Sequence, residues 1–153
     1  MKQIKLTRGQ YALVDDEDYD SLSQYKWYCS SNGYACRRPA SGIVYMHRVL
    51  AMPINGLETD HINRNRLDNQ KHNLRPLTRT LNNMNSPSEK NSSSKYRGVY
   101  FCKARHKWIA QISINRKPKN LGGFNSEEDA ARVYNEAAEK YYGSVAYKNE
   151  VSD

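Results

Sequence analysis

Apolar residues occupy every second position of "KWIAQISI", residues 107–114, and the positions between them are polar except for Ile109. Because the side chains of a strand point alternately to its two faces, this pattern predicts a half-buried strand. The stretches "YRGVYF" before it and "PKNLGGF" after it are each set off by turn residues, so we expect a three-stranded antiparallel sheet. The apolar face of the middle strand would hold Trp108, Ala110, Ile112 and Ile114, and the other face Lys107, Ile109, Gln111 and Ser113.

The next segment, "NSEEDAARVYNEAAEKYYG", carries the end signals of a helix. Ser126 suits the N-cap with Asp129 three residues on, acidic residues fill the first turn, and Gly143 follows the end. We expect this helix to cover one face of the sheet and to leave the other, basic face open, and such a face fits a DNA major groove. Its predicted apolar stripe consists of Ala130, Val133, Tyr134, Ala137, Ala138 and Tyr141.

The first 45 residues have the pattern of a small sheet. "YALVDDEDY" predicts a short strand that runs into an acidic turn, and "KWYCSSNGYACRR" and "GIVYMHRVL" predict strands separated by turn residues. Residues 45–52 can continue as a short helix that stops at Pro53. The cluster "DDEDYD" is either a metal site or a solvated acidic turn. We favour the turn, because nothing nearby supplies a substrate-binding geometry.

A Ser-rich segment, "NSPSEKNSSSK", contains one Pro and no apolar residue, which is typical of a flexible linker. The sequence therefore predicts an α+β protein in which an N-terminal domain spans residues 1–85 and a C-terminal domain spans 95–145. Residues 86–94 form the predicted flexible linker between the two domains.

Charge indicates the class of partner. The chain of 153 residues has a formal net charge of +8 and a pI of about 9.4, which favours a polyanion. Residues 95–119 hold eight Lys or Arg and no acid, whereas residues 127–139 hold five acids and one Arg. We therefore expect one face of the C-terminal domain to meet nucleic acid and another to meet solvent. No apolar run approaches the length of a membrane span and the start lacks a signal-peptide segment, so we expect a cytoplasmic protein.

The three cysteines lack any C-x-x-C pair. Cys102 and His106 are four residues apart, a spacing that a zinc site can use, but a zinc ribbon needs four ligands in close pairs. Reduced, partly buried thiols are the interpretation that we favour.

Residues 59–85 contain seven Asn, although Asn is a poor former of helices and strands. Here "LETDHI" predicts a strand, "NRNRLDNQKHN" a wide loop, "LRPL" a returning strand, and "TRTLNNMN" a helix capped by Thr78. Such a unit brings the end of its first strand beside its helix, where Asp60 and Asn82 can offer two oxygens to one cation next to His61. A site with a small number of oxygen ligands suits Mg²⁺ or Mn²⁺. A neutral His beside it can deprotonate a water.

The spacing of these residues resembles the HNH nuclease motif, the ββα-metal active site. Asn73 follows His61 by twelve residues, and Asn82 follows nine further on. The resemblance implies a catalytic set in which His61 is the general base, Asp60 and Asn82 are metal ligands, and Asn73 braces the loop and orients His61. It places the HNH core at about residues 45–85. "MHRVLAMP" is similar to the lead-in of one subfamily, and we interpret His47 in it as structural.

Residues 96–143 resemble an AP2 domain, the DNA-binding module of plant transcription factors and some mobile nucleases. The blocks "YRGV", "KWIAQI", "LGGF" and "EEDAARVYNEAA" occur in order. Tyr100, Ser113 and Asn120 depart from the plant pattern, so the resemblance implies DNA binding but not the plant target sequence. Around the phosphodiester site we expect DNA contacts from Arg64, Arg66 and Arg75. In the C-terminal domain we expect them from Arg97, Tyr100, Lys103, Arg105, Lys107, Gln111, Ser113, Lys117 and Lys119.

Together these features predict a Mg²⁺- or Mn²⁺-dependent endonuclease of the homing type that acts on double-stranded DNA and is encoded by a phage or mobile element of a bacterial host. One active site per chain predicts a nick in one strand per monomer. No protein partner is indicated, and an oligomer is not implied. The alternative is a DNA-binding transcription regulator with a decayed nuclease fold. An RNA-binding role is third, because it would predict exposed stacking aromatics on the sheet.

Overall fold

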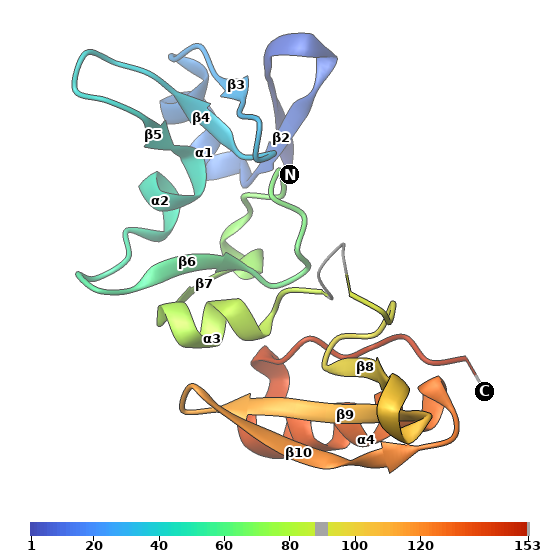
Figure 1. Cartoon of the computed structure of the whole chain (residues 1–153). Helices are drawn as coiled ribbons and strands as arrows, with labels where there is room; N and C mark the ends of the chain where they lie inside the picture. Colours follow the sequence, from blue (N-terminus) through green and yellow to red (C-terminus); the bar gives the residue numbers. More distant parts are fainter. Residues whose placement is uncertain (88–91, 153) are drawn as a thin grey trace. The chain divides into compact units, whose positions relative to one another are not determined.

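The computed structural model describes residues 1–87 and 92–152, and the chain divides into two compact units (Figure 1). Unit 1 is Met1–Asn82 and unit 2 is Asn83–Asp153, so the boundary lies within helix α3. No described helix is both long enough and apolar enough to cross a membrane. The two units are described separately.

Unit 1 is built from small sheets and short helices rather than from one N-terminal sheet. Strands β1 and β2 form an antiparallel hairpin, β3, β4 and β5 form a three-stranded sheet in that order, and β6 pairs with β7. The pattern of the first residues did not predict β1. The elements are β1 (Lys2–Lys5), η1 (Thr7–Gly9), β2 (Tyr11–Val14), α1 (Asp16–Ser23), β3 (Tyr28–Cys29), β4 (Ala35–Arg37), β5 (Val44–Tyr45), α2 (Met46–Ala51), β6 (Glu58–His61), η2 (Lys71–Asn73), β7 (Leu74–Leu77) and α3 (Arg79–Met84).

The core of unit 1 lies between the hairpin, α1 and the three-stranded sheet. Trp27 is buried there, and its indole N–H donates to the Leu22 carbonyl at 2.8 Å, which satisfies the polar atom of a large apolar side chain. The buried cluster consists of Ile4, Leu6, Ala12, Val14, Leu22, Trp27, Ala35 and Met46.

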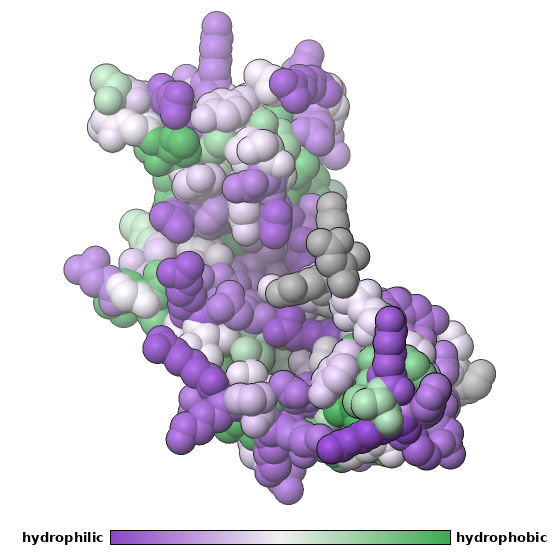
Figure 2. Space-filling model, in the orientation of Figure 1, coloured by the Kyte–Doolittle hydropathy of each residue, from purple (hydrophilic) through white to green (hydrophobic). Residues whose placement is uncertain are grey.

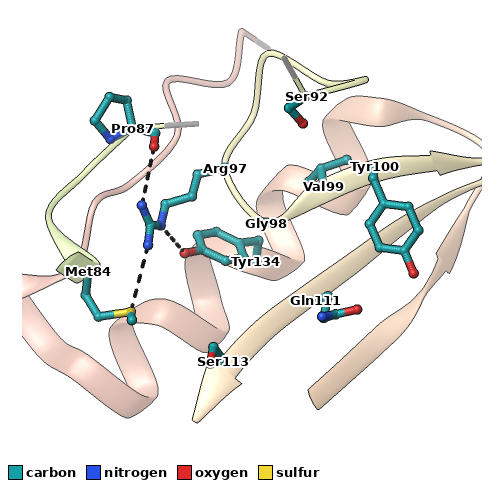
Figure 3. Close-up of a pocket in the computed structure, with 10 residues that line it drawn as sticks. All are labelled: Met84, Pro87, Ser92, Arg97, Gly98, Val99, Tyr100, Gln111, Ser113 and Tyr134. Carbon is teal, nitrogen blue, oxygen red and sulfur yellow. Dashed lines mark hydrogen bonds between the residues drawn. The ribbon is translucent and has the colours of Figure 1, made fainter. Parts of the chain in front are cut away.

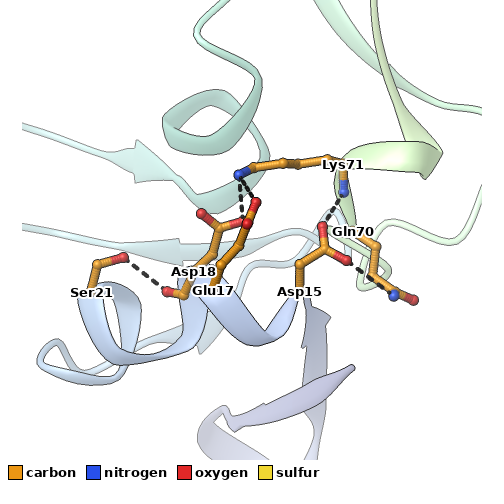
Figure 4. Close-up of polar contacts among 6 residues, drawn as sticks. All are labelled: Asp15, Glu17, Asp18, Ser21, Gln70 and Lys71. Atoms are coloured by element: carbon orange, nitrogen blue, oxygen red, sulfur yellow. Dashed lines mark hydrogen bonds and ion pairs between the residues drawn. The ribbon is translucent and has the colours of Figure 1, made fainter.

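The prediction of an acidic turn is wrong, because this segment forms the helix α1. Acidic side chains in the first turn of a helix interact favourably with its dipole, and Leu22 secures the helix to the core. The acids also hold the loop before β7 (Figure 4). The Asp15 carboxylate accepts from the Lys71 backbone N–H at 2.8 Å, and the Lys71 ammonium contacts Glu17 at 2.5 Å and Asp18 at 3.2 Å.

The predicted strand–loop–strand–helix unit is confirmed. β6 and β7 are antiparallel with Asp60 opposite Arg75 and His61 opposite Leu74. The Thr78 hydroxyl accepts from the Leu81 N–H at 3.4 Å at the start of α3, as expected of a cap. The short helix α2 also ends where predicted, just before Pro53.

Unit 2 is a three-stranded antiparallel sheet in the order β10-β9-β8, with α4 packed on one face (Figure 1). The prediction of this arrangement is confirmed. Apolar side chains from β9 and α4, such as Ala110, Ile112, Ala130 and Tyr134, are buried between the two layers. The elements are β8 (Val99–Cys102), η3 (Lys103–Arg105), β9 (Lys107–Ile114), β10 (Lys117–Phe124), α4 (Glu127–Tyr142) and η4 (Gly143–Val145).

The cap of α4 is confirmed, because the Ser126 hydroxyl accepts from the Asp129 N–H at 3.1 Å. Its apolar stripe differs from the prediction near both ends. Tyr141 is 38% exposed, while Ala131 is buried and Tyr142 packs against the core. Residues four apart lie on nearly the same side of a helix, so the buried line that passes through Tyr134 continues to Tyr142.

Gly98 explains why the "YRGV" block contains glycine. Its φ is +73°, and a Cβ at this position would lie 2.1 Å from the Tyr134 ring. The backbone of Gly98 therefore packs directly on Tyr134, and its carbonyl accepts from the Gln111 N–H at 2.8 Å. Both the conformation and the close approach require a residue without a side chain.

Asn149, in the tail after η4, fastens the start of unit 2. Its side chain accepts from the Arg97 N–H at 2.7 Å and donates to the Arg97 carbonyl at 3.1 Å. Its backbone exchanges hydrogen bonds with the Asn135 side chain at 2.7 and 2.9 Å. Asn149 thus serves as a substitute strand partner for Arg97 and joins it to α4.

The segment predicted as a linker falls partly outside the described residues, which omit 88–91. Its described ends contact unit 2. Ser94 is buried, and its hydroxyl accepts from the Tyr96 N–H at 3.0 Å and donates to Glu127. The Ser86 carbonyl accepts from Arg97.

Replacing Asn149 should destabilise unit 2. Asn149→Ala removes two side-chain hydrogen bonds and leaves the part-buried backbone of Arg97 without them, so we expect a loss of about 2 kcal/mol in the free energy of unfolding. Denaturant unfolding of the full chain measures it. Asn120→Ala, at an exposed position with a single bond to Gly122, is the matched control and should cost less than half as much. Equal effects of the two variants would contradict the role of Asn149.

Candidate active site and nucleic-acid interface

Strand β6 carries the predicted catalytic residues on its two faces. Neighbouring residues of a strand point to opposite sides, so Glu58 and Asp60 share one side while Thr59 and His61 share the other. Asp60 and His61 are 6% and 4% exposed, which places the Asp-His pair inside unit 1 rather than on its surface. Each of the two therefore depends on the residues packed around it.

Arg75 holds the Asp60 carboxylate. Its Nε and one terminal nitrogen both lie 2.8 Å from Asp60 Oδ2, across the antiparallel pairing of β6 with β7. The Arg75 side chain is 18% exposed, so this ion pair is largely screened from water. We expected Arg75 to contact DNA, and the structure instead turns its guanidinium to the proposed metal ligand.

Asn82 lies on α3 beside the same side of β6. Its amide N–H donates to Glu58 Oε2 at 2.7 Å. The sequence interpretation paired Asn82 with Asp60 alone, and the structure adds Glu58 as its direct partner.

His61 is oriented by Asn69. His61 Nε2 lies 3.4 Å from Asn69 Oδ1, and Asn69 is fully buried. Because a carbonyl oxygen only accepts, this contact favours the tautomer with the proton on Nε2 and leaves Nδ1 as the basic nitrogen. Burial lowers the pKa of His61, and the contact with Asn69 and the nearby charge of Asp60 oppose this in part. The imidazole is therefore neutral near pH 7 and able to accept a proton.

Two aromatic rings lie beside the imidazole of His61, and a third packs on those two. The centroid of His47 lies 5.2 Å away with its plane nearly perpendicular, and that of Tyr34 lies 5.9 Å away. Tyr45 packs on both Tyr34 and His47. Burial, together with the nearby His61 and Arg48, lowers the pKa of His47 to about 3. His47 is thus a neutral, buried part of the wall beside His61.

The asparagines of the wide loop replace regular secondary structure with side-chain hydrogen bonds. Asn73 Oδ1 accepts from the Asn63 N–H at 2.9 Å, and its Nδ2 donates to the Asp68 carbonyl at 2.8 Å. The side-chain oxygens of Asn63 and Asn65 each accept from the backbone N–H two residues further on, which is the turn role that suits Asn. Asn73 therefore braces the loop, whereas the residue in contact with His61 is Asn69.

The N-terminal hairpin holds this loop in place. The Leu13 N–H donates to the Leu67 carbonyl and the Asn69 N–H donates to the Leu13 carbonyl, both at 2.8 Å. β2 therefore fixes the backbone of Asn69, and through it the imidazole of His61.

A cavity of about 180 Å³ opens next to this site. His47 and Thr59 carry buried polar atoms there, Nδ1 and Oγ1, that no described protein group satisfies. The lining residues are Asn32, Tyr34, Tyr45, His47, Arg48, Glu58, Thr59 and Asn82.

The donor set suits a hard divalent cation. The Asp60 carboxylate and the amide oxygen of Asn82 are oxygen donors, and Mg²⁺ typically takes one or two carboxylates and fills its other positions from water and substrate phosphate. Residues 1–87 and 92–152 contain no group of three or more His, Cys, Asp or Glu that could hold a metal. Cys102 and His106, whose spacing a zinc site can use, therefore do not belong to such a group in the described part of the chain.

The open face of the unit 2 sheet brings together four of the residues predicted to contact DNA. The strand register places Tyr100 and Lys107 with Gln111 and Ser113 on the side away from α4. Ile109 shares this face but is 2% exposed, and its side chain lies over Gly123. A cavity of about 540 Å³ adjoins this face, lined among others by Tyr100, Gln111 and Ser113 (Figure 3).

Arg97 faces inward. Its guanidinium donates to the backbone carbonyls of Asn83, Ser86 and Pro87 and to the Tyr134 hydroxyl. Figure 3 shows the contacts with Pro87 and Tyr134. These contacts join the segment before the sheet to the core of unit 2. In the structure Arg97 is a brace, and its side chain is committed to protein groups.

Lys117 and Lys119 do not share the open face. The register pairs them with Ile114 and Ile112, whose side chains face α4, and Lys119 donates to the Tyr141 hydroxyl at 2.7 Å. The basic run in the sequence is therefore divided between the two sides of the sheet. Lys103 and Arg105 lie in the exposed turn η3 between β8 and β9.

Arg64 and Arg66 lie on the exposed part of the wide loop in unit 1. Arg66 stacks over the Tyr34 ring at 4.8 Å and donates to the Asn32 carbonyl at 2.6 Å. Both arginines line a shallow hollow beside the Asn32-Gly33 turn. Figure 2 shows hydrophilic residues over much of the visible surface.

Comparison with known proteins agrees with both parts of this description. An uncharacterised HNH endonuclease of Acanthamoeba polyphaga mimivirus is 31% identical over 153 residues, which cover 94% of this chain and 77% of the relative. The AP2 domain family matches residues 94–144. An AP2-like ethylene-responsive transcription factor of Arabidopsis thaliana is 40% identical over 57 residues, 37% of this chain and 12% of its own length. No solved structure matches the chain.

A strand–loop–strand–helix unit with an Asp-His pair, followed by a sheet-and-helix module, defines a nuclease-type protein with an appended DNA-binding domain. The chain belongs to the HNH endonuclease family, and its C-terminal part is an AP2 domain.

Glu58 and Asn69 are the residues of the site that the sequence interpretation missed. Glu58 had a usable signal: it lies two residues before Asp60, so a strand must place both on one side. Asn69 had none, because only the packing of the loop on β2 brings it to His61. The partner of Asp60 could have been found by aligning the two predicted strands, which sets Arg75 opposite it.

Acid should destabilise unit 1 through His47. Its folded pKa is about 3, whereas an unfolded His has a pKa of about 6.5, so below pH 6.5 only the unfolded chain takes up the proton. The free energy of unfolding should fall by up to about 1.4 kcal/mol per pH unit on acidification from 6.5, and His61 acts in the same direction. Urea unfolding between pH 7 and 5 measures the slope.

In this experiment His47→Phe should flatten the slope, because it removes the group that is protonated only on unfolding. His72→Gln, at an exposed position of the same unit, is the matched control. A slope in His47→Phe as steep as in the unmodified chain would contradict the assignment.

Proposed function

We propose that the chain is a divalent-metal-dependent endonuclease that hydrolyses phosphodiester bonds of double-stranded DNA. The observation that carries the proposal is the buried Asp60-His61 pair on β6, with Arg75 on the carboxylate and Asn69 on the imidazole. Membership of the HNH endonuclease family supports this reading.

Asp60 and Asn82 would hold one Mg²⁺ or Mn²⁺ through their oxygens. When bound, the metal supplies positive charge at the scissile phosphate and its leaving oxygen. His61 accepts a proton from the attacking water at Nδ1 while Asn69 keeps the opposite ring nitrogen protonated. The oxygen of that water forms the new bond to phosphorus, and the bond from phosphorus to the leaving oxygen breaks. Asn73 keeps the loop closed around His61.

DNA binding is assigned mainly to unit 2. The AP2 match and the likeness to plant transcription factors support this, and the open sheet face supplies Lys107, Tyr100, Gln111 and Ser113 as contacts. Phosphate contacts position the protein on the duplex, and contacts with base edges select the site. Arg64 and Arg66 add phosphate contacts near the active site of unit 1.

We further propose that one chain nicks one strand, because it carries one active site and the two strands run in opposite directions. A homing-type role in a viral or mobile element is supported by the viral source of the relative. The competing function, a transcription regulator with a decayed nuclease fold, shares the DNA-binding face and differs only in cleavage.

The first test is cleavage of supercoiled plasmid. Mg²⁺ should support nicking and EDTA should abolish it. His61→Ala should lower the rate by about 10²- to 10⁴-fold, the usual contribution of a general base, while DNA affinity in a gel-shift assay stays nearly unchanged. The matched control is His72→Ala, which replaces an exposed His of the same loop and should cleave normally. Binding without cleavage by the unmodified chain would favour the regulator.

The second test concerns the sheet face. Each phosphate contact adds about 0.9 to the slope of log affinity against log salt, so roughly five or six contacts should weaken binding about a thousandfold between 50 and 200 mM salt. Lys107→Ala should lower the slope by about 0.9, because Lys107 is on the open face. Lys119→Ala, whose ammonium contacts Tyr141 on the other side of the sheet, should leave it unchanged. A lower slope in Lys119→Ala and an unchanged slope in Lys107→Ala would instead indicate that DNA binds on the α4 side of the sheet.

A further inference from the structure

Glu58 lies next to the proposed metal ligand Asn82, and the family motif assigns it no role. Its carboxylate accepts from Asn82 Nδ2 at 2.7 Å, within the range of a strong charge-assisted hydrogen bond. Its other oxygen lies 3.8 Å from Arg79 Nε, but Arg79 is 84% exposed, so that ion pair adds little. The main partner of Glu58 is therefore the Asn82 amide.

The two ends of this contact have separate backbone supports. Glu58 is fixed by the pairing of β6 with β7, where it lies opposite Leu77. Asn82 is fixed in α3, where its N–H donates to the Thr78 carbonyl at 2.9 Å. Both backbones are therefore held in place, and this favours a stable hydrogen bond between the Glu58 and Asn82 side chains.

An asparagine amide has two ends of nearly equal size, and only the oxygen can bind a metal. A carboxylate accepts hydrogen bonds and never donates, so the end of Asn82 that touches Glu58 must be the nitrogen. The oxygen is then turned away from Glu58. Glu58 and Asp60 stand on the same side of β6, and Asn82 contacts Glu58 on that side.

We propose that Glu58 is a positioning residue that locks the Asn82 amide with its oxygen available to the metal. This inference rests on the proposed function, in which Asn82 is a metal ligand. Residues that orient a ligand typically change metal affinity by about 10- to 100-fold when they are replaced. Glu58 acts through the Asn82 side chain and does not itself touch the reacting atoms.

The test exchanges the two ends of the hydrogen bond. In Glu58→Gln the new amide can donate as well as accept, so Asn82 is free to turn over, and affinity for Mn²⁺ should fall about 10-fold. In the double variant Glu58→Gln/Asn82→Asp the glutamine donates to one carboxylate oxygen and the other remains for the metal. The double variant should return to within about 3-fold of the unmodified chain, because orientation no longer matters.

Mn²⁺ alone is the probe, titrated into the full chain without DNA and followed by electron paramagnetic resonance of the free ion. Melting temperatures of all variants are recorded beside the affinities, because a merely structural role would change stability and not Mn²⁺ binding. Glu17→Gln is the matched control: its carboxylate contacts Lys71 and no residue of the site, so Mn²⁺ affinity should not change. With plasmid, Glu58→Gln should raise the Mg²⁺ concentration for half-maximal cleavage and leave the saturated rate nearly unchanged.

Unchanged Mn²⁺ affinity in Glu58→Gln overturns the inference, and so does a double variant that binds as weakly as Glu58→Gln. In the second case the negative charge of Glu58, rather than the amide orientation, is what the metal requires. Failure of the proposed function has a different signature, because the unmodified chain would then neither bind Mn²⁺ nor cleave plasmid.

Discussion

The pairing of β6 with β7 is the constraint on which the site in unit 1 depends. It sets Asp60 opposite Arg75 and, by alternation, sends His61 to the other side of the strand. A shift of one residue in this register would exchange the two faces, which would separate the carboxylate from its arginine and the imidazole from Asn69. The chemistry proposed for the site thus rests on a backbone ladder of four residue pairs.

Ion pairs and side-chain amides shape the site and the loop that follows this ladder. Asp60 is paired with the Arg75 guanidinium, and burial lowers the pKa of His61. In the loop, asparagine amides satisfy backbone groups, and Asn63, Asn65 and Asn73 all act in this way.

Unit 2 shows how a run of basic residues is divided by the geometry of a sheet. Lys107 points to the open face, Lys119 points toward α4, and Arg97 is held by carbonyl groups of the segment before β8. The open face is consequently more polar than basic. This arrangement favours recognition through hydrogen bonds at the sheet face, with phosphate contacts supplied by its ends. Gly98 and Asn149 matter to this face indirectly, because they fix where β8 begins.

The sequence by itself determined the elements whose patterns are local. Alternation predicted β9, and the Ser126 cap and acidic first turn predicted α4. The segments "LETDHI", "LRPL" and "TRTLNNMN" predicted the strand–loop–strand–helix unit. All of these signals lie within a few residues of the element they specify. The acidic cluster before Leu22 was misjudged as a turn, since its helix depends on packing against the core.

Only the tertiary structure decided which side chains became partners. Asn69 reaches His61 because β2, more than fifty residues earlier, holds its backbone. Glu58 reaches Asn82, and Arg97 turns inward, because contacts between elements select among side-chain directions that the sequence leaves open. Hydrogen bonds and ion pairs act over a few ångströms, so they depend on packing, and packing joins residues that are distant along the chain.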